Sequence, residues 1–297
     1  MTLDYYLVDV FTKKPLEGNA LAVFPDARTL DDTTMQAIAR EMNLSETSFV
    51  FPPTQPAHAA RVRIFTPNYE MEFAGHPTIG TASVIQRIGV VQSGEATFVL
   101  EENIGGVPVR IEAGENPLIW LRTPVIEKGV QLDRGGCAAA LGLDERDLLP
   151  GVPCELWSAG NPNIYVALRD RVAVDRAWVD PVKLRAVSPA EDKNCLFVFT
   201  PTEEGAYSRM FAPEQGIVED PATGSAAGPL AAFMMAHSLT SSAAGHRVVS
   251  EQGTKMGRRS YLHILVHGER GADGIDVGGH VTPVAHATMI LDRAFDR

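Results

Sequence analysis

The 297-residue chain has only three cysteines, no run of about 18 apolar residues, and fewer basic than acidic side chains. Cys137, Cys154 and Cys195 are widely separated and form no CxxC or His/Cys cluster, so we expect neither a zinc site nor a disulfide framework. No segment is apolar enough to predict a membrane span. The first residues show no basic segment and no small-residue cleavage site, so we expect no signal peptide and a cytoplasmic protein with reduced thiols.

The charge balance argues against nucleic acid as a partner. The chain carries 26 Lys+Arg and 37 Asp+Glu, a net charge of -11, whereas a nucleic-acid-binding protein has a basic patch or stripe. A small anionic substrate is still compatible, because helix N-termini and backbone N–H groups bind anions without net positive charge. Apolar residues make up 45% of the chain, enough for a full core in roughly two domains.

The chain repeats itself once. Four pairs of similar segments occur in the same order, at offsets of 142, 148, 146 and 144 residues, close to half the chain length. The pairs are Gly18–Val23 with Gly160–Val166, Phe49–Phe51 with Phe197–Phe199, Arg63–Pro67 with Arg209–Pro213, and His76–Ala82 with Asp220–Ala226. Four collinear pairs predict two homologous halves with a pseudo-twofold cleft between them.

The pattern within each half predicts an α+β fold. Short apolar runs indicate strands, and Met35, Ile38, Ala39 and Met42 have helical spacing after Asp31 or Asp32. The segments 78–88 and 222–237 carry almost no charge, which predicts buried central helices. We expect two pseudo-symmetric domains, 1–125 and 126–297, each a curved, mostly antiparallel sheet wrapped around one helix. Whether the last dozen residues return to the first domain is left open.

Both central helices begin with residues suited to binding an anion. Gly75-His76-Pro77-Thr78 opens the first, and Asp220-Pro221-Ala222-Thr223-Gly224-Ser225 opens the second. Proline is favoured near a helix start, and small residues let a carboxylate approach the free N–H groups. His76 and Asp220 occupy matching places in the repeat and could both titrate in the cleft. The alternative is that Asp220 caps its helix and His76 is an ordinary buried polar residue.

Glu46 is the third candidate for acid/base chemistry. It stands between the amphipathic helix and an apolar strand, and its counterpart in the second half is Asn194. A carboxyl group flanked by apolar residues is placed for desolvation and a raised pKa, which suits a general acid/base near neutral pH. The alternative is that Glu46 only caps or neutralises a loop.

These segments together resemble the PhzF-like phenazine-biosynthesis family and, more distantly, diaminopimelate epimerase. The resemblance covers nearly the whole chain. Its segments are Asp9–Thr12, Gly18–Val23, Asn43–Phe49, Arg63–Pro67, Phe73–Pro77, Arg209–Pro213, Glu219–Ala226, Ser250–Gly253 and Met256–Arg258.

The resemblance implies a diaminopimelate-epimerase-like fold, a homodimer and a reaction without metal or organic cofactor. It implies isomerisation of a small carboxylate, for which the characterised case is a hydroxylated dihydro-aromatic amino acid. Glu46 would move the proton between two carbons, and His76 and Asp220 would assist. The substrate would be bound by Asn19, Ser45, Gly75, Pro77, Thr223, Gly224 and Ser225.

One departure from the epimerases limits the mechanism. Those relatives use two cysteines, one at each central helix start, where this chain has Gly75-His76-Pro77 and Asp220-Pro221-Ala222. Without a thiolate pair, a two-thiol racemase mechanism is not expected. Two alternatives stay open: a racemase or epimerase acting through Glu46 and Asp220, and a small-molecule-binding protein without catalysis.

Overall fold

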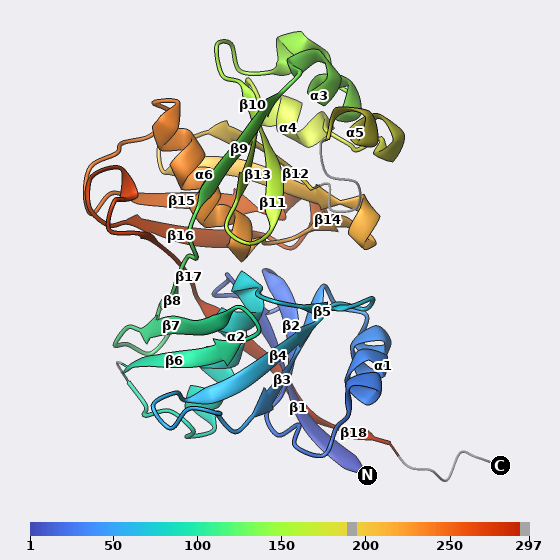
Figure 1. Ribbon diagram of the computed structural model, residues 1–297, viewed down its shortest axis with the longest axis vertical. Coiled ribbons are helices and arrows are strands. Elements are labelled where there is room, and N and C mark those ends of the chain that lie inside the picture. The colour runs from blue at the N-terminus through green and yellow to red at the C-terminus, as the bar shows by residue number, and fades with distance from the viewer. Residues whose placement is uncertain (95, 189–194, 292–297) are drawn as a thin grey trace, which may run out of the picture. The chain divides into compact units, whose positions relative to one another are not determined.

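The chain forms two compact units in the computed structural model, which describes residues 1–94, 96–188 and 195–291 (Figure 1). Unit 1 comprises Met1–Leu121 and Gly278–Arg297, and unit 2 comprises Arg122–Val277. The chain therefore passes from unit 1 to unit 2 and back. Asn194, the expected counterpart of Glu46, lies outside the described residues.

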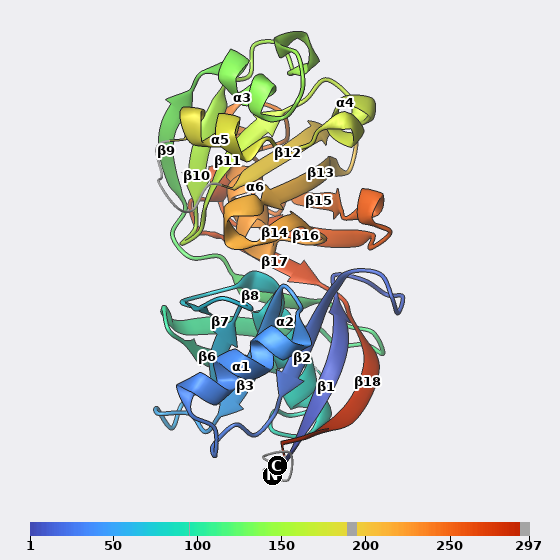
Figure 2. The ribbon, with the colours of Figure 1, turned by 90° about the vertical axis from the view of Figure 1, so that its right-hand side faces the viewer.

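Unit 1 is a mostly antiparallel sheet in the order β18-β1-β2-β3-β4-β6-β7-β8, with β5 also paired to β4. The β2–β3 and β4–β6 pairs are parallel. The strands are β1 (Thr2–Val10), β2 (Asn19–Phe24), β3 (Glu46–Phe51), β4 (Ala60–Phe65), β5 (Glu70–Met71), β6 (Ala96–Glu102), β7 (Gly105–Ile111), β8 (Ile119–Arg122) and β18 (Val281–Ile290). Figure 2 shows β18 beside β1, so both ends of the chain contribute to this sheet.

Two helices cover opposite faces of the unit 1 sheet. Because side chains alternate along each strand, successive residues of β2 pack against different helices. Leu21 faces α2 (Gly75–Arg87), where it lies against Gly80, while Ala22 and Phe24 pack in the cluster under α1 (Asp32–Met42). The N-cap of α1 is Asp31, whose side chain accepts from the Thr34 N–H, so the predicted helix and its start are confirmed.

Unit 2 is also a mostly antiparallel sheet, in the order β9-β10-β11-β12-β13-β15-β16, with β14 paired to β13. The β11–β12 and β13–β15 pairs are parallel. The strands are β9 (Glu127–Leu132), β10 (Cys154–Ser158), β11 (Pro162–Ala167), β12 (Leu196–Pro201), β13 (Gly205–Ala212), β14 (Ile217–Asp220), β15 (Arg247–Gln252) and β16 (Ser260–Val266). The strand β17 (Ile275–Gly279) lies where the chain returns to unit 1.

The helices of unit 2 also lie on both faces of its sheet. Ile164 and Val166 pack in the cluster under α3 (Arg134–Ala140), α4 (Arg171–Arg176) and α5 (Pro181–Val187). The alternate residue Tyr165 faces α6 (Gly224–Ala236), where its hydroxyl donates to the Ala226 carbonyl and its ring stacks on Phe233. Short 3-10 turns occur at Glu145–Asp147, Pro213–Gln215, Thr254–Met256 and Glu269–Gly271.

The two units share one topology, which confirms the fold class expected from the repeat. In unit 1 a parallel pair, β2–β3, is followed by antiparallel β4, then the helix α2, then β6 parallel to β4. Unit 2 repeats this sequence with β11, β12, β13, α6 and β15. Both central helices are buried along most of their length, as their lack of charge predicts.

The described part of the chain contains no helix that is both long and apolar enough to cross a membrane. All three cysteines are free and buried.

Candidate functional site

The first turn of α2 has two backbone N–H groups that point out of the N-terminal end of the helix. Ala74 is the N-cap in an extended conformation, Gly75 and His76 follow as the first two helical residues, and Pro77 has no N–H. The next N–H, from Thr78, already donates to the Ala74 carbonyl at 3.2 Å. In this turn, therefore, only the N–H groups of Gly75 and His76 point out of the helix. They lie at the positive end of the helix dipole.

Glu46, His76 and Asn19 meet in unit 1. Glu46 begins β3 and Asn19 begins β2, and these strands are parallel, so their starts lie on the same edge of the sheet. His76 Nδ1 lies 3.3 Å from Glu46 Oε2 and 3.4 Å from Asn19 Nδ2. The side chain of His76 is 4% exposed and that of Glu46 is 12% exposed, so the contact is nearly closed to water.

His76 is a neutral imidazole at neutral pH. Burial lowers its pKa to about 3, against a hydrogen bond with the Ala20 backbone that favours the charged form. The contact with Glu46 is therefore between a carboxyl group and a neutral ring rather than an ion pair. His76 Nε2 is buried and has no hydrogen-bond partner among the described residues. A buried ring nitrogen in that state is a candidate for contact with a substrate.

The other unit 1 residues predicted for the site surround this cluster in sequence. Ser45 directly precedes β3 and is half-buried. Gly75 and Pro77 flank His76 in the buried first turn of α2. The structure therefore brings the unit 1 candidates to the start of β2, the start of β3 and the start of α2.

The unit 2 candidates form a second buried cluster. Asp220 ends β14, and its carboxylate accepts from the Thr223 hydroxyl at 2.5 Å. Thr223 is the N-cap of α6, and Gly224 and Ser225 are its first two residues, whose N–H groups have no intrahelical acceptor. Asp220, Thr223 and Ser225 are each less than a tenth exposed.

The predicted match between His76 and Asp220 is wrong in detail. In strand pairing, Met71 lies opposite Ile64 of β4, and Asp220 lies opposite Met210 of β13, so Asp220 corresponds to Met71. His76 is the second residue of α2, whereas Asp220 precedes the N-cap of α6 by three residues. Asp220 ends β14 and Thr223 is the N-cap of α6, so Asp220 does not cap this helix.

Sequence reasoning assigned no role to Gln252, which holds the Asp220 segment. Its amide donates to the Asp220 carbonyl at 2.8 Å and to the Thr223 hydroxyl at 3.0 Å, and its oxygen accepts from the Thr223 N–H at 3.2 Å. The following Gly253 has a φ of +73° and packs its backbone onto Pro221, where any Cβ would collide with a carbonyl oxygen. The sequence feature that could have indicated this role of Gln252 is the Gln–Gly pair in the Ser250–Gly253 segment.

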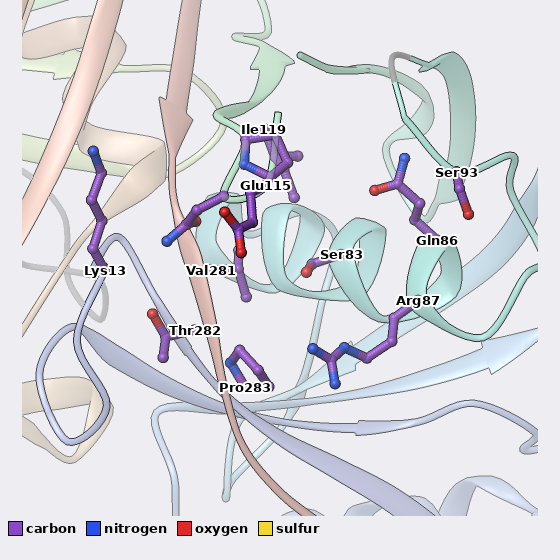
Figure 3. A pocket seen from close by; sticks show the side chains of 12 residues that line it. Lys13, Ser83, Gln86, Arg87, Ser93, Glu115, Ile119, Val281, Thr282 and Pro283 are labelled. Atoms are coloured by element: carbon purple, nitrogen blue, oxygen red, sulfur yellow. The ribbon is translucent and has the colours of Figure 1, made fainter. Parts of the chain in front are cut away.

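A cavity of about 550 Å³ lies elsewhere on unit 1 (Figure 3). Its polar lining includes Lys13, Ser83, Gln86, Arg87 and Glu115. Three of these are on the C-terminal half of α2, away from the turn that carries His76. Within the described ranges, no group of three His, Cys, Asp or Glu side chains is arranged to hold a metal ion.

Comparison with known proteins identifies the family. The model of the family described as "Phenazine biosynthesis-like protein" matches residues 8–287. An uncharacterized isomerase of Mesorhizobium japonicum is 38% identical over 306 residues, covering 98% of this chain and 99% of that protein. The trans-2,3-dihydro-3-hydroxyanthranilate isomerase of Pseudomonas chlororaphis is 36% identical over 299 residues, covering 97% of this chain and 99% of that protein.

A solved structure agrees with the fold. The crystal structure of a Bacillus anthracis phenazine biosynthesis protein of the PhzF family matches with a TM-score of 0.89 and 24% identity, covering 98% of this chain and 100% of that chain. This coverage includes both units and their central helices, α2 and α6.

Proposed function

The chain belongs to the phenazine biosynthesis-like protein family and is an isomerase, and from this premise we propose that it moves a proton between two carbons of a small carboxylate substrate. Glu46 is the general acid/base: it removes the proton from one carbon and returns it to another. His76 and Asp220 orient the substrate or hold a second proton.

One observation carries this assignment: the contact of Glu46 with a buried, neutral His76. A neutral ring next to the carboxyl group can donate or accept a hydrogen bond as Glu46 changes protonation state, without adding a charge. Proton exchange with a carbon also needs a site poor in water, and both side chains are nearly buried. Because Glu46 and His76 supply the acid/base chemistry, the proposed reaction needs no metal or organic cofactor.

The helix starts supply candidate ligands for the substrate carboxylate. The N–H groups of Gly75 and His76 in α2, and of Gly224 and Ser225 in α6, lie at the positive ends of their helices. Asn19, Ser45, Pro77 and Thr223 complete the proposed substrate contacts. A homodimer working in the cytoplasm is part of the same proposal.

The first substrate to test is trans-2,3-dihydro-3-hydroxyanthranilate, the substrate in the name of the Pseudomonas relative. A hydroxylated dihydro-aromatic amino acid has the required carboxylate and an acidic C–H next to a conjugated system. Other small cyclic and amino carboxylates form the rest of the panel.

The experiment is an NMR assay in D₂O that follows carbon-bound deuterium and shifted double bonds in the panel. We expect exchange by the native protein and a loss of about 10²–10⁴-fold in Glu46→Gln. Glu41→Gln is the matched control, because it makes the same change at an exposed position near the end of α1. Full turnover by a folded Glu46→Gln protein would exclude Glu46 as the acid/base.

The stereochemistry of the product separates the isomerase from a racemase or epimerase. A moved double bond with deuterium at a new carbon supports the isomerase. Deuterium at the same carbon with inverted configuration supports an epimerase, in which Glu46 and Asp220 act from opposite faces; then Asp220→Asn removes exchange as fully as Glu46→Gln does.

A further inference from the structure

A second buried acid, Glu102, lies against the first turn of α2. Glu102 ends β6, is 4% exposed, and its Oε1 is 2.6 Å from Thr78 Oγ1. The N–H of Ala74, the N-cap of α2, also donates to the Glu102 carboxyl group. Glu102 thus contacts α2 at Ala74 and at Thr78, and His76 lies between these two points.

The two hydrogen-bond contacts of the Thr78 hydroxyl indicate the protonation state of Glu102. Thr78 Oγ1 is also 2.8 Å from the Ala74 carbonyl oxygen, which can only accept. A hydroxyl group has one hydrogen, so Thr78 can donate to the Ala74 carbonyl or to Glu102 Oε1, but not to both. Both short contacts are hydrogen bonds at the same time only if Thr78 donates to the Ala74 carbonyl and a protonated Glu102 donates to Thr78.

The surroundings of Glu102 agree with a neutral acid. Its second oxygen, Oε2, is buried and has no hydrogen-bond partner within the described ranges, an arrangement that would be costly for a charged carboxylate. Burial raises the pKa of Glu102 to about 8, although the hydrogen bonds with Thr78 and with the Ala74 N–H and the positive charge of Arg61 on β4 act to lower it. Across the sheet, β7 places Gly105 opposite Glu102, and the hydrogen-bond partners of Glu102 on the α2 side are the uncharged Ala74 and Thr78.

We propose that Glu102 is a protonated positioning residue, which fixes the first turn of α2 so that His76 keeps its contact with Glu46. The chain of hydrogen bonds runs from Glu102 to the Thr78 hydroxyl and on to the Ala74 carbonyl, and it returns through the Ala74 N–H. Ionisation of Glu102 would break it, because Thr78 would have to donate to the carboxylate and release Ala74. The effect of Glu102 on catalysis rests on the proposed function, but the hydrogen bonds that Glu102 makes with α2 do not.

The neighbouring Glu101 provides a matched control. Its side chain is also nearly buried, but it binds another segment: it accepts from the N–H groups of Thr54 and Gln55, the Thr54 hydroxyl and His58 Nδ1. These donors lower the pKa of Glu101 to about 2. Adjacent residues on one strand therefore hold opposite protonation states, and only Glu102 contacts α2.

The test is NMR of the whole protein with ¹³C-labelled glutamate carboxyl groups and ¹⁵N-labelled histidine rings, at pH 6 to 9. We expect one glutamate to be protonated at neutral pH and to titrate near pH 8, a signal absent in Glu102→Gln and kept in Glu101→Gln. The His76 ring signals should shift with the same midpoint in the native protein. They should stay constant with pH in Glu102→Gln, whose amide donates to Thr78 at every pH.

Glu102→Ala, which cannot make either contact, should shift or split the His76 signals, and Glu101→Gln should leave them unchanged. If Glu102→Ala does not fold, the pH dependence of the native protein against Glu102→Gln decides. The proposal is overturned if no glutamate is protonated at pH 7, or if the His76 signals do not follow that titration.

These readouts need no substrate, so they separate this proposal from the proposed function. If Glu46→Gln keeps full turnover, the proposed function fails while the NMR result still stands. Once a substrate is found, Glu102→Ala should lower kcat more than it changes KM, and Glu102→Gln should recover most of kcat. A purely structural role would instead lower stability and leave the kcat of the folded fraction unchanged.

Discussion

His76 Nδ1 lies 3.3 Å from Glu46 Oε2 and the imidazole ring is buried and neutral, so the two residues are in contact without forming an ion pair. This relationship joins the start of β3 to the start of α2, two elements that the chain does not connect directly.

His76 should stay neutral under mildly acidic conditions. Burial lowers its pKa to about 3, well below the ordinary value of 6.5, so its ring signals should not titrate between pH 7 and pH 5. ¹⁵N NMR of the labelled protein measures this directly. A midpoint near 6.5 for His76 would contradict the burial seen in the structure.

Replacing His76 should lower turnover without unfolding the protein. His76→Asn keeps one hydrogen-bonding group of similar reach but cannot pass a proton between two ring nitrogens. We expect a loss of about 10²-fold or more in kcat, measured by the D₂O exchange assay. Normal turnover in a folded His76→Asn protein would assign the ring a structural role only.

Gln252 should stabilise unit 2 through the Asp220–Thr223 segment. Gln252→Leu leaves the Asp220 carbonyl and the Thr223 N–H buried without their present partner, which costs about 1–3 kcal/mol for each group. Urea unfolding should show a loss of that order, whereas the exposed Gln131→Leu should change little. An unchanged unfolding midpoint would mean that other groups satisfy this segment.

Gly80 should resist any larger side chain. A Cβ at this position would lie 2.5 Å from Leu21 Cδ2 and 2.9 Å from Val10 Cγ2, both in the buried layer between α2 and the sheet. Gly80→Ala should therefore lower the free energy of unfolding by about 1–3 kcal/mol, in spite of the better helix propensity of alanine. Ser83→Ala, one turn along and partly exposed, should be nearly neutral.

The stability difference between Glu102→Gln and the native protein should grow with pH. The folded protein keeps the Glu102 proton up to about pH 8, while the unfolded chain releases it near the ordinary pKa of 4.5. The stabilising contribution of this group is therefore full below pH 4.5, falls by about 1.4 kcal/mol per pH unit as pH rises, and levels off above pH 8. Glutamine does not titrate, so the variant gains relative to the native protein across this window.

Urea unfolding at pH 5, 6, 7 and 8 measures that difference. The Glu101→Gln protein is the control, since the pKa of Glu101 is lowered to about 2 and its contribution changes only below pH 4.5. A flat difference for Glu102→Gln over this range would mean that the folded protein holds no extra proton at Glu102.

Much of the fold could be predicted from the sequence, for reasons that lie in local chemistry. The repeat predicted two units of one topology, and the uncharged segments predicted the buried helices α2 and α6. Asp31 or Asp32 was expected near the start of α1, and Asp31 is its N-cap, accepting from the Thr34 N–H. These features depend on residues close to each other in the chain.

The parts that sequence reasoning missed depend on strand register and on contacts between distant segments. The repeat aligned His76 with Asp220 by their neighbours in sequence, but the pairing of β14 with β13 places Asp220 opposite Met210 and away from the helix start. Glu101 and Glu102 are neighbours in the sequence, and their different partners, the Thr54–Gln55 segment and Thr78, are visible only in the structure. Which predicted site residues take part in catalysis is decided by the experiments above.

The pairing of β1 with β18 has a consequence for synthesis on the ribosome. The strand β1 is made first, but its outer neighbour spans Val281–Ile290 and is made almost last. The continuous segment Arg122–Val277 is complete before that strand emerges, so unit 2 can fold while unit 1 still has an open edge at β1. A nascent chain stalled before residue 281 would expose that edge, and chaperones or other chains could bind there until translation ends.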